Sequence, residues 1–332
     1  MRERLFPRVV LRFLGFFAAA AFVVGLVGAL LRGDGLGNAL LSAIEAAVLA
    51  FAGGLIARSF VNLLLLSGRD SPNVSFLLGW AFFLWPGVVD ILPRLLSGKQ
   101  YATRAGVLLW IATSVGAFTG TMDGMWQTHQ WLGPGVVAFA LDESWGLNGT
   151  AQGDLLHLVN FSWGDHVVGE TRTDAHRYKS GFAVKSGFAF TQGAVMSSNT
   201  FPAGSPLFSH EDTHVWQNRL FGPGYVLSYI AWMVVLFIPG LLYGVLSGNG
   251  AGTGIQAFSY FSNPWEAWGY AVQGVNRGTF GPGIWPGVAV VIASVVFFPL
   301  FLLPCYWIVR RVWSRARGQP LLSGLGATGP AG

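Results

Sequence analysis

Long apolar runs constrain this chain more than any other feature. A helix needs about 20 mostly apolar residues to cross a bilayer, and stretches of roughly that length or longer occur at 9–31, 36–66, 74–96, 105–122, 225–246 and 285–309. Hydrophobic residues make up 52% of the chain and charged residues only 11%, so a soluble globule could not cover its surface with polar side chains. The sequence predicts an α-helical integral membrane protein with about five or six transmembrane helices.

Positive charge gathers at the two ends of the chain. The formal net charge is +5, and arginines cluster around the start of the first apolar run and after the last one, at Arg2, Arg4, Arg8, Arg12, Arg310, Arg311, Arg315 and Arg317. Basic residues beside membrane spans face the cytoplasm and interact with anionic phospholipids. We therefore expect the lipid bilayer as a partner, and no nucleic acid.

The first apolar run is longer than the core of a signal peptide, which has roughly 7–15 residues, so we expect a retained anchor with a cytoplasmic N-terminus. Six crossings place both basic ends on one side, as the positive-inside rule prefers. The connection that holds Arg94, Lys99 and Arg104 then faces the opposite side, which leaves the topology open.

The composition divides the chain into four parts. Residues 1–122 hold about four predicted spans, 285–311 hold one more, and 312–332 form a basic and then disordered tail. Residues 123–284 contain all six histidines, and alternation of apolar and polar residues at 182–191 predicts a strand. Shorter strands are predicted at 136–141, 155–161 and 194–198. We expect an inserted α+β extramembrane domain here.

The residues that carry chemistry are His210, Glu211 and His214. Two histidines four residues apart on a helix share one face, and both imidazoles can reach one metal ion. Glu211 lies on an adjacent face, from which it can take a proton from a water without being a ligand. The single cysteine, Cys305, excludes a zinc site built from several thiolates.

The pattern His210-Glu211-x-x-His214 resembles the signature of the zincin metallopeptidases, and the stretch from about 188 to 274 is similar to uncharacterised bacterial membrane proteins of this type. The resemblance implies a zincin-like domain at 123–284, Zn²⁺ as cofactor, Glu211 as catalytic base, a peptide or membrane-proximal protein segment as substrate, and a bacterial plasma membrane as location. It leaves open on which side of the membrane the site lies.

Gluzincins, the branch of this family with a glutamate ligand, take a third metal ligand from a later helix. Glu266 matches that role, because Pro264 would begin a helix with Glu266 in its first turn. Zincins also have an edge strand that pairs with an extended substrate, and residues 188–197 could form it; an ordinary packed strand is the alternative.

Six more residues are candidates for supporting the site. Gln217 follows His210 by seven residues and shares its face. Tyr270 and His166 could stabilise an oxyanion, as could Tyr260 or Arg219. Asp212 departs from the zincin pattern, in which the positions between the glutamate and the second histidine are usually uncharged. It either points away from the metal as a hydrogen-bond acceptor or marks a non-catalytic relative.

The apolar segment at 225–247 raises a conflict. If it crosses the bilayer, His214 and Glu266 end on opposite sides and cannot share a metal. A break at Pro239-Gly240 would let the chain re-enter and return on the same side, and we favour that interpretation. Otherwise the third ligand must precede the motif, with Asp165, His166 or Glu170 as candidates.

Three functions are consistent with these features. The first is a zinc-dependent membrane metallopeptidase, in which Glu211 acts as general base. The second is a non-catalytic membrane protein with a structural or vestigial metal site, acting by partner binding. The third is a small-solute transporter, because Glu45, Arg58 and Asp90 place charge within predicted spans.

Overall fold

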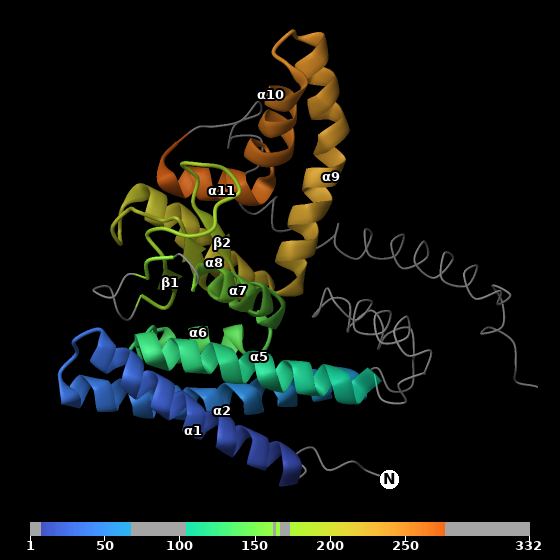
Figure 1. Ribbon diagram of the computed structural model, residues 1–332. Helices are drawn as coiled ribbons and strands as arrows, with labels where there is room; N and C mark the ends of the chain where they lie inside the picture. Colours follow the sequence, from blue (N-terminus) through green and yellow to red (C-terminus); the bar gives the residue numbers. More distant parts are fainter. Residues whose placement is uncertain (1–7, 68–103, 162–163, 167–172, 276–332) are drawn as a thin grey trace, which may run out of the picture.

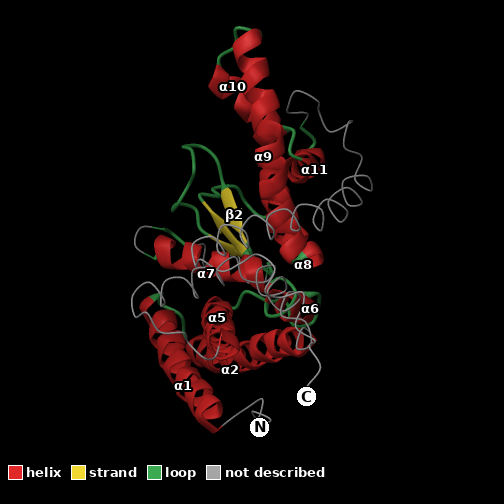
Figure 2. Ribbon diagram, turned by 90° about the vertical axis from the view of Figure 1, so that its right-hand side faces the viewer, coloured by secondary structure: helices red, strands yellow, loops and turns green. Residues whose placement is uncertain are grey.

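The structure, a computed structural model, describes residues 8–67, 104–161, 164–166 and 173–275 (Figures 1 and 2). The chain is mostly helical, with a small mixed sheet. Within these residues three helices are long and apolar enough to cross a membrane: α1 (Arg8–Leu31), α2 over Leu36–Leu63, and α9 (Pro223–Leu246). The predicted spans at 74–96 and 285–309 and the tail at 312–332 lie outside the described residues, so a total of five or six spans stays a prediction.

The helices α1, α2 (Leu36–Ser67) and α5 (Arg104–Trp126) pack side by side in a bundle (Figure 1). α2 and α5 touch through their backbones: a Cβ on Gly53 would lie 2.3 Å from the oxygen of Gly116, and one on Gly120 would lie 2.1 Å from the oxygen of Leu49. Contacts between small residues are typical of helices packed in membranes. α2 runs unbroken through Gly53. α5 covers the predicted span 105–122, although it is not among the three candidates above.

A compact domain lies between the bundle and α9 (Figure 2). It contains α6 (Gly135–Asp142), α7 (Leu147–Asn160) and a sheet in the order β1-β3-β2. β1 (His176–Arg177) is parallel to β3 (Val195–Ser197), and β2 (Phe190–Gln192) is antiparallel to β3 at one edge. β3 confirms the strand predicted at 194–198. The strands predicted at 136–141 and 155–161 are wrong, since these residues are helical, and short apolar runs do not distinguish helix from strand.

The motif helix α8 (Pro206–Phe221) has well-defined ends. Ser205 caps its N-terminus by accepting a hydrogen bond from the backbone N–H of Phe208, and Pro206 occupies the first turn. Gly222 ends it with a φ of 51°, a conformation that favours glycine, and α9 begins at Pro223. This sharp turn leads the chain directly from α8 into the apolar helix.

The chain returns from α9 by a turn beyond its end, not by a break within it. α9 continues through Pro239, so the predicted break at Pro239-Gly240 is wrong. After the turn, α10 (Ala251–Ile255) and the π-helix η1 (Gln256–Phe261) run back along α9 (Figure 1). α11 (Pro264–Gln273) then begins beside the start of α9, where the Asn263 amide donates to the backbone oxygen of Tyr229 at 3.1 Å.

The axis of α9 runs across those of α2 and α5, and both views agree on this (Figures 1 and 2). The three apolar helices therefore do not share one direction in the structure. Whether residues 225–247 span or re-enter the bilayer stays a prediction. The hairpin made of α9, α10 and η1 brings the start of α11 back beside the first turns of α9.

We expect the hairpin to tolerate no side chain where its two arms cross. A Cβ on Gly254 would lie 2.2 Å from the oxygen of Gly240, so Gly254→Ala must separate the arms, at a cost of about 1–3 kcal/mol. Gly252 lies in the same short helix, and a Cβ added there would have nothing within 4 Å, so Gly252→Ala is the matched control. Thermal unfolding in detergent should show a lower midpoint for Gly254→Ala alone. Equal midpoints would contradict this packing.

Buried ion pairs join the domain to the bundle and to α8. At the C-terminal end of α5, Asp123 lies 3.0 Å from His129 Nε2, and His129 Nδ1 lies 3.5 Å from Asp174. On α8, Arg219 binds the carboxylate of Asp142 through two nitrogens. Burial disfavours a charged imidazole, but the carboxylate of Asp123 outweighs that effect and, with Asp174 and Asp142, raises the pKa of His129 to about 9.

The raised pKa of His129 predicts that stability falls with rising pH. Because the folded protein binds this proton more tightly than the unfolded chain, whose histidines titrate near 6.5, the stabilisation is complete below about pH 6.5. It is lost as the pH rises through about 9. Unfolding measured from pH 6 to pH 10 should show this decline in the wild type and a flatter profile in His129→Gln. Parallel profiles would contradict it.

Candidate metal centre

His210 and His214 lie one turn apart on α8, and both rings are buried. Their Nε2 atoms are 3.1 Å apart. Gly269 of α11 permits this position of the His210 ring, since a Cβ there would lie 2.8 Å from the ring. The two imidazoles therefore converge as the spacing of the motif predicts.

Glu266 supplies the third group from the first turn of α11. Its Oε2 lies 3.4 Å from His210 Nε2, and its Oε1 lies 3.3 Å from His214 Nε2. Within the described part of the chain, His210, His214 and Glu266 are the three residues whose ligand atoms all lie within 4.8 Å of one another. The predicted ligand set is thus assembled although Glu266 follows His214 by 52 residues in the sequence, and it could hold a metal ion.

The spacing fits a small tetrahedral ion. With bonds of about 2.0–2.1 Å, two ligand atoms of such an ion lie about 3.3–3.4 Å apart. The two Nε2 atoms are 3.1 Å apart, and each lies 3.3 or 3.4 Å from a different oxygen of Glu266. The site also favours positive charge. Burial opposes a charged imidazole, but the carboxylate of Glu266 outweighs it and raises the pKa of His214 to about 9. The Nδ1 atom of His210 is buried without a hydrogen-bond partner in the part of the chain described.

A second layer of hydrogen bonds orients the ligands. His214 Nδ1 donates to the Oε1 of Gln217 at 2.8 Å, and the amide of Gln217 donates to the backbone oxygen of Trp265 at 3.1 Å. The amide oxygen can only accept, so Nδ1 carries a proton, and in the neutral ring, the form that binds a metal, the Nε2 lone pair of His214 faces the centre. The predicted orienting role of Gln217 is consistent with these contacts.

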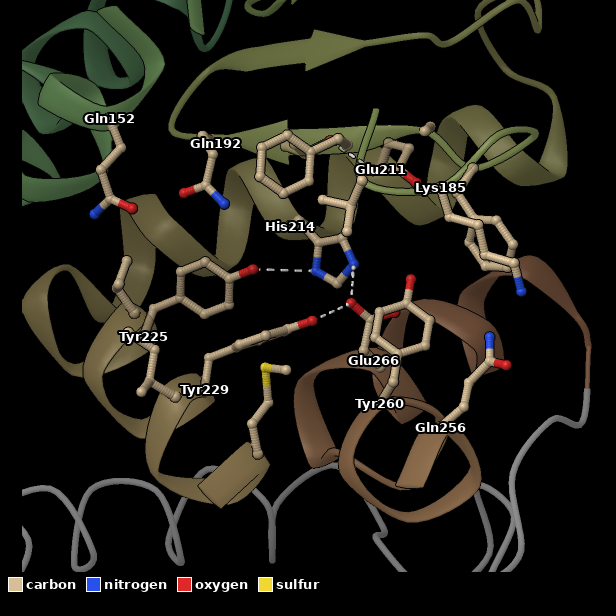
Figure 3. Close-up of a pocket in the computed structure, with 18 residues that line it drawn as sticks. Gln152, Lys185, Gln192, Glu211, His214, Tyr225, Tyr229, Gln256, Tyr260 and Glu266 are labelled. Atoms are coloured by element: carbon tan, nitrogen blue, oxygen red, sulfur yellow. Dashed lines mark hydrogen bonds and ion pairs between the residues drawn. The ribbon is translucent and has the colours of Figure 1, made fainter. Parts of the chain in front are cut away.

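Two tyrosines at the start of α9 complete this layer, and sequence reasoning missed both. The hydroxyl of Tyr229 donates to Glu266 Oε1 at 2.8 Å, and that of Tyr225 lies 3.3 Å from His214 Nδ1 (Figure 3). They occur four residues apart in a segment that otherwise reads as lipid-facing. That spacing places both on one helix face, which was the available signal.

Glu211 lies at the edge of the metal group and faces a cavity. Its Oε2 accepts a hydrogen bond of 2.5 Å from Thr191 on the edge strand β2. The cavity has a volume of about 370 Å³ and lies between the β2 segment, α9 and η1 (Figure 3). His214, Glu266 and Tyr260 line it together with apolar side chains, among them Phe188, Phe190, Val226, Ile230 and Met233. The Glu211 carboxylate, two residues of the metal group and a set of apolar side chains therefore line the same cavity.

The other candidate residues do not all lie at the metal group. Tyr270 packs on the ring of His210, with ring centres 4.4 Å apart. Asp212 lines a different cavity with Trp216 and Trp268, and burial raises its pKa to about 6. His166 is not part of the site, contrary to prediction, because it stacks on Trp126 and bonds to His176. Arg219, also considered, is bound to Asp142, and Asp165 lies near Ser180, so neither serves the metal group. Glu170 lies outside the described residues.

Gly269 offers a way to test the site without touching a ligand. We expect Gly269→Ala to push the His210 ring away and to weaken metal binding at least about tenfold, as displacement of supporting groups does at metal sites. Gly224, at the start of α9, has nothing within 4 Å of an added Cβ, so Gly224→Ala should bind metal like the wild type. Competition with a chromogenic chelator would measure both. Unchanged affinity in Gly269→Ala would contradict the packing of His210.

Comparison of the chain with protein-family models, with curated proteins and with solved structures gave no match. The case for function therefore rests on the residues and their geometry.

Proposed function

We propose that this protein is a zinc-dependent, membrane-associated peptidase. The observation that carries the proposal is the convergence of His210, His214 and Glu266 at separations of 3.1–3.4 Å, with the carboxylate of Glu211 beside them. Two imidazoles and a carboxylate that leave one position open are the ligand set of catalytic zinc sites. The same set, buried and oriented by Gln217 and Tyr229, favours zinc over harder ions, which prefer oxygen ligands alone.

Each residue has a distinct role in the proposed reaction. A bound zinc ion supplies Lewis acidity, which polarises the scissile carbonyl and lowers the pKa of water. Glu211 accepts the proton of the attacking water and later donates it to the leaving amine. Thr191 holds the Glu211 carboxylate in place by donating to one oxygen. Tyr260 lines the cavity beside Glu266, and burial raises the pKa of its hydroxyl, so it stays a donor for the developing oxyanion.

The walls of the cavity favour an extended apolar peptide as substrate. β2 is the edge strand of its sheet, and an edge strand can pair with an extended backbone. The opposite wall is α9, whose side chains Val226, Ile230 and Met233 face the cavity while Val234 and Ile238 are more than half exposed. A membrane-proximal segment could reach the cavity along this helix.

Hydrolysis of a peptide library by the full-length protein in detergent micelles tests the proposal. We expect cleavage beside apolar residues, loss of cleavage with a zinc chelator, and recovery when zinc is added back. His214→Ala should hold no zinc at this group and should not cleave. No cleavage by protein that carries zinc at His210, His214 and Glu266 would remove the peptidase proposal.

A non-catalytic role is the second candidate, and one observation favours it. The ligands come from two helices, α8 and α11, between which the chain runs through the hairpin, so a metal ion would add to the contacts that hold α11 against α8. In that case zinc removal should lower the unfolding temperature, and Glu211→Gln should change nothing. The transport hypothesis is less supported, because Glu45 accepts a hydrogen bond from Trp131 at 2.6 Å and Asp90 lies outside the described residues.

A further inference from the structure

The four histidines outside α8 gather in a second buried cluster. The sequence has six histidines; His157 of α7, His176 of β1, and His129 and His166 from the connecting segments meet near the end of α5. His129, His157 and His176 are at most 2% exposed. The peptidase proposal uses none of them, and burial of three imidazoles in a small domain requires an explanation.

His176 is the centre of this cluster. Its Nε2 lies 2.9 Å from Asp123 Oδ1, and its Nδ1 lies 3.1 Å from His166 Nε2. Since the carboxylate can only accept, Nε2 of His176 carries the proton and Nδ1 presents a lone pair towards His166. The pair repeats two features of the first site, a nitrogen–nitrogen separation of 3.1 Å and an oxygen that fixes the tautomer of one histidine.

His157 stands against His176, with ring centres 4.4 Å apart. Its Nδ1 is bonded to the hydroxyl of Tyr178 at 2.8 Å. If that N–H donates, Nε2 of His157 keeps its lone pair, as Nδ1 of His176 does. Nδ1 of His176 also lies 3.3 Å from the hydroxyl of Thr128, which a metal ion would have to displace.

His129 differs from the other three. Its Nε2 lies 3.0 Å from Asp123 and its Nδ1 lies 3.5 Å from Asp174. Both ring nitrogens therefore face carboxylates, and neither is available to a metal. It serves as the counter-ion that keeps Asp123 charged.

We propose that His157, His166 and His176 form a second site for a divalent transition-metal ion such as zinc. Three imidazoles suit zinc, copper and nickel and disfavour calcium or magnesium. The three ring nitrogens lie farther apart than the ligand atoms of the first site. Among the described residues, only the first site has three ligand atoms that all lie within 4.8 Å of one another. Binding must draw the His157 ring inward, so the second site binds zinc more weakly than the first.

Metal analysis of the full-length protein in detergent tests the second site. After stripping and dialysis against zinc, the wild type should hold two zinc ions per chain. His214→Ala and His176→Ala should each hold one, and the double variant none. Lys179→Met, at an exposed position near the cluster, should hold two. Partial chelation should remove the zinc that depends on His176 first.

Two further measurements keep the test decisive if His176→Ala does not fold. His166 is only partly buried, so His166→Ala is the milder variant, and it should weaken the second zinc at least about tenfold. Cobalt bound to His214→Ala should give visible absorption that disappears in His214→Ala/His166→Ala. One zinc in the wild type, unchanged in His166→Ala and His176→Ala, would overturn the second site and leave a hydrogen-bonded network. These outcomes do not depend on Glu211 or on peptide cleavage, so the two proposals fail separately.

Discussion

Replacement of Glu211 by glutamine is expected to abolish peptide hydrolysis while leaving the zinc content unchanged. Glutamine keeps the size of the side chain and can still contact Thr191, but it cannot take a proton from water. General-base catalysis contributes about 10²–10⁴-fold to a rate, so kcat/KM should fall by at least that factor. Because Glu211 is not among the three residues that gather around the metal position, zinc per chain should match the wild type.

Variants of the neighbouring residues serve as controls for this result. Thr191→Val removes the hydrogen bond to Glu211 and should lower the rate by a smaller factor without loss of zinc. Asp212→Asn alters the carboxylate that lines the other cavity and should leave cleavage and zinc nearly unchanged. Full activity in Glu211→Gln would end the peptidase proposal, whereas loss of activity in Asp212→Asn would show that Asp212 belongs to the reaction.

The metal group was predictable because its geometry is encoded locally. The i and i+4 spacing of His210 and His214 fixes their relation on any helix, and Pro264 marks the start of the helix that carries Glu266. Only the approach of α8 and α11 to each other could not be predicted without the three-dimensional structure. It depends on the hairpin turn after α9, and Pro239 pointed to the wrong place for that turn because a buried or lipid-facing helix can tolerate a proline.

The second histidine cluster and the ion pairs were not predictable in the same way. His176 and Asp123 are 53 residues apart, and no local spacing connects a strand residue to the end of a distant helix. Arg219 illustrates the same limit: as a sequence feature it was a candidate oxyanion donor, but its partner, Asp142, lies 77 residues earlier. The strands predicted at 136–141 and 155–161 failed because short helices can carry apolar runs as short as those of strands. Apolar side chains such as Val136, Val137 and Leu158 are more than half exposed on these helices.

Loss of the ion pair between Arg219 and Asp142 is expected to produce the largest change in stability. Arg219 is fully buried, and its Nε and Nη2 donate to the two carboxylate oxygens of Asp142 at 3.0 and 2.7 Å. Nη2 also donates to the backbone oxygen of Asp174. Arg219→Met leaves the carboxylate of Asp142 buried and unpaired, which typically costs about 3–5 kcal/mol. Because Arg219 follows His214 by five residues on α8, zinc affinity should fall as well.

A double-mutant cycle separates the pair from the general effect of substitution in the core. Arg219→Met combined with Asp142→Leu removes both charges, and replacement of a buried pair by apolar residues of similar volume is often neutral or stabilising. The double variant should therefore recover most of the stability lost in Arg219→Met, measured by denaturant unfolding in detergent. Lys179→Met, at an exposed position, should change the unfolding free energy by less than about 0.5 kcal/mol. If the losses of unfolding free energy in Arg219→Met and Asp142→Leu simply add in the double variant, the ion pair does not hold α8 to the domain.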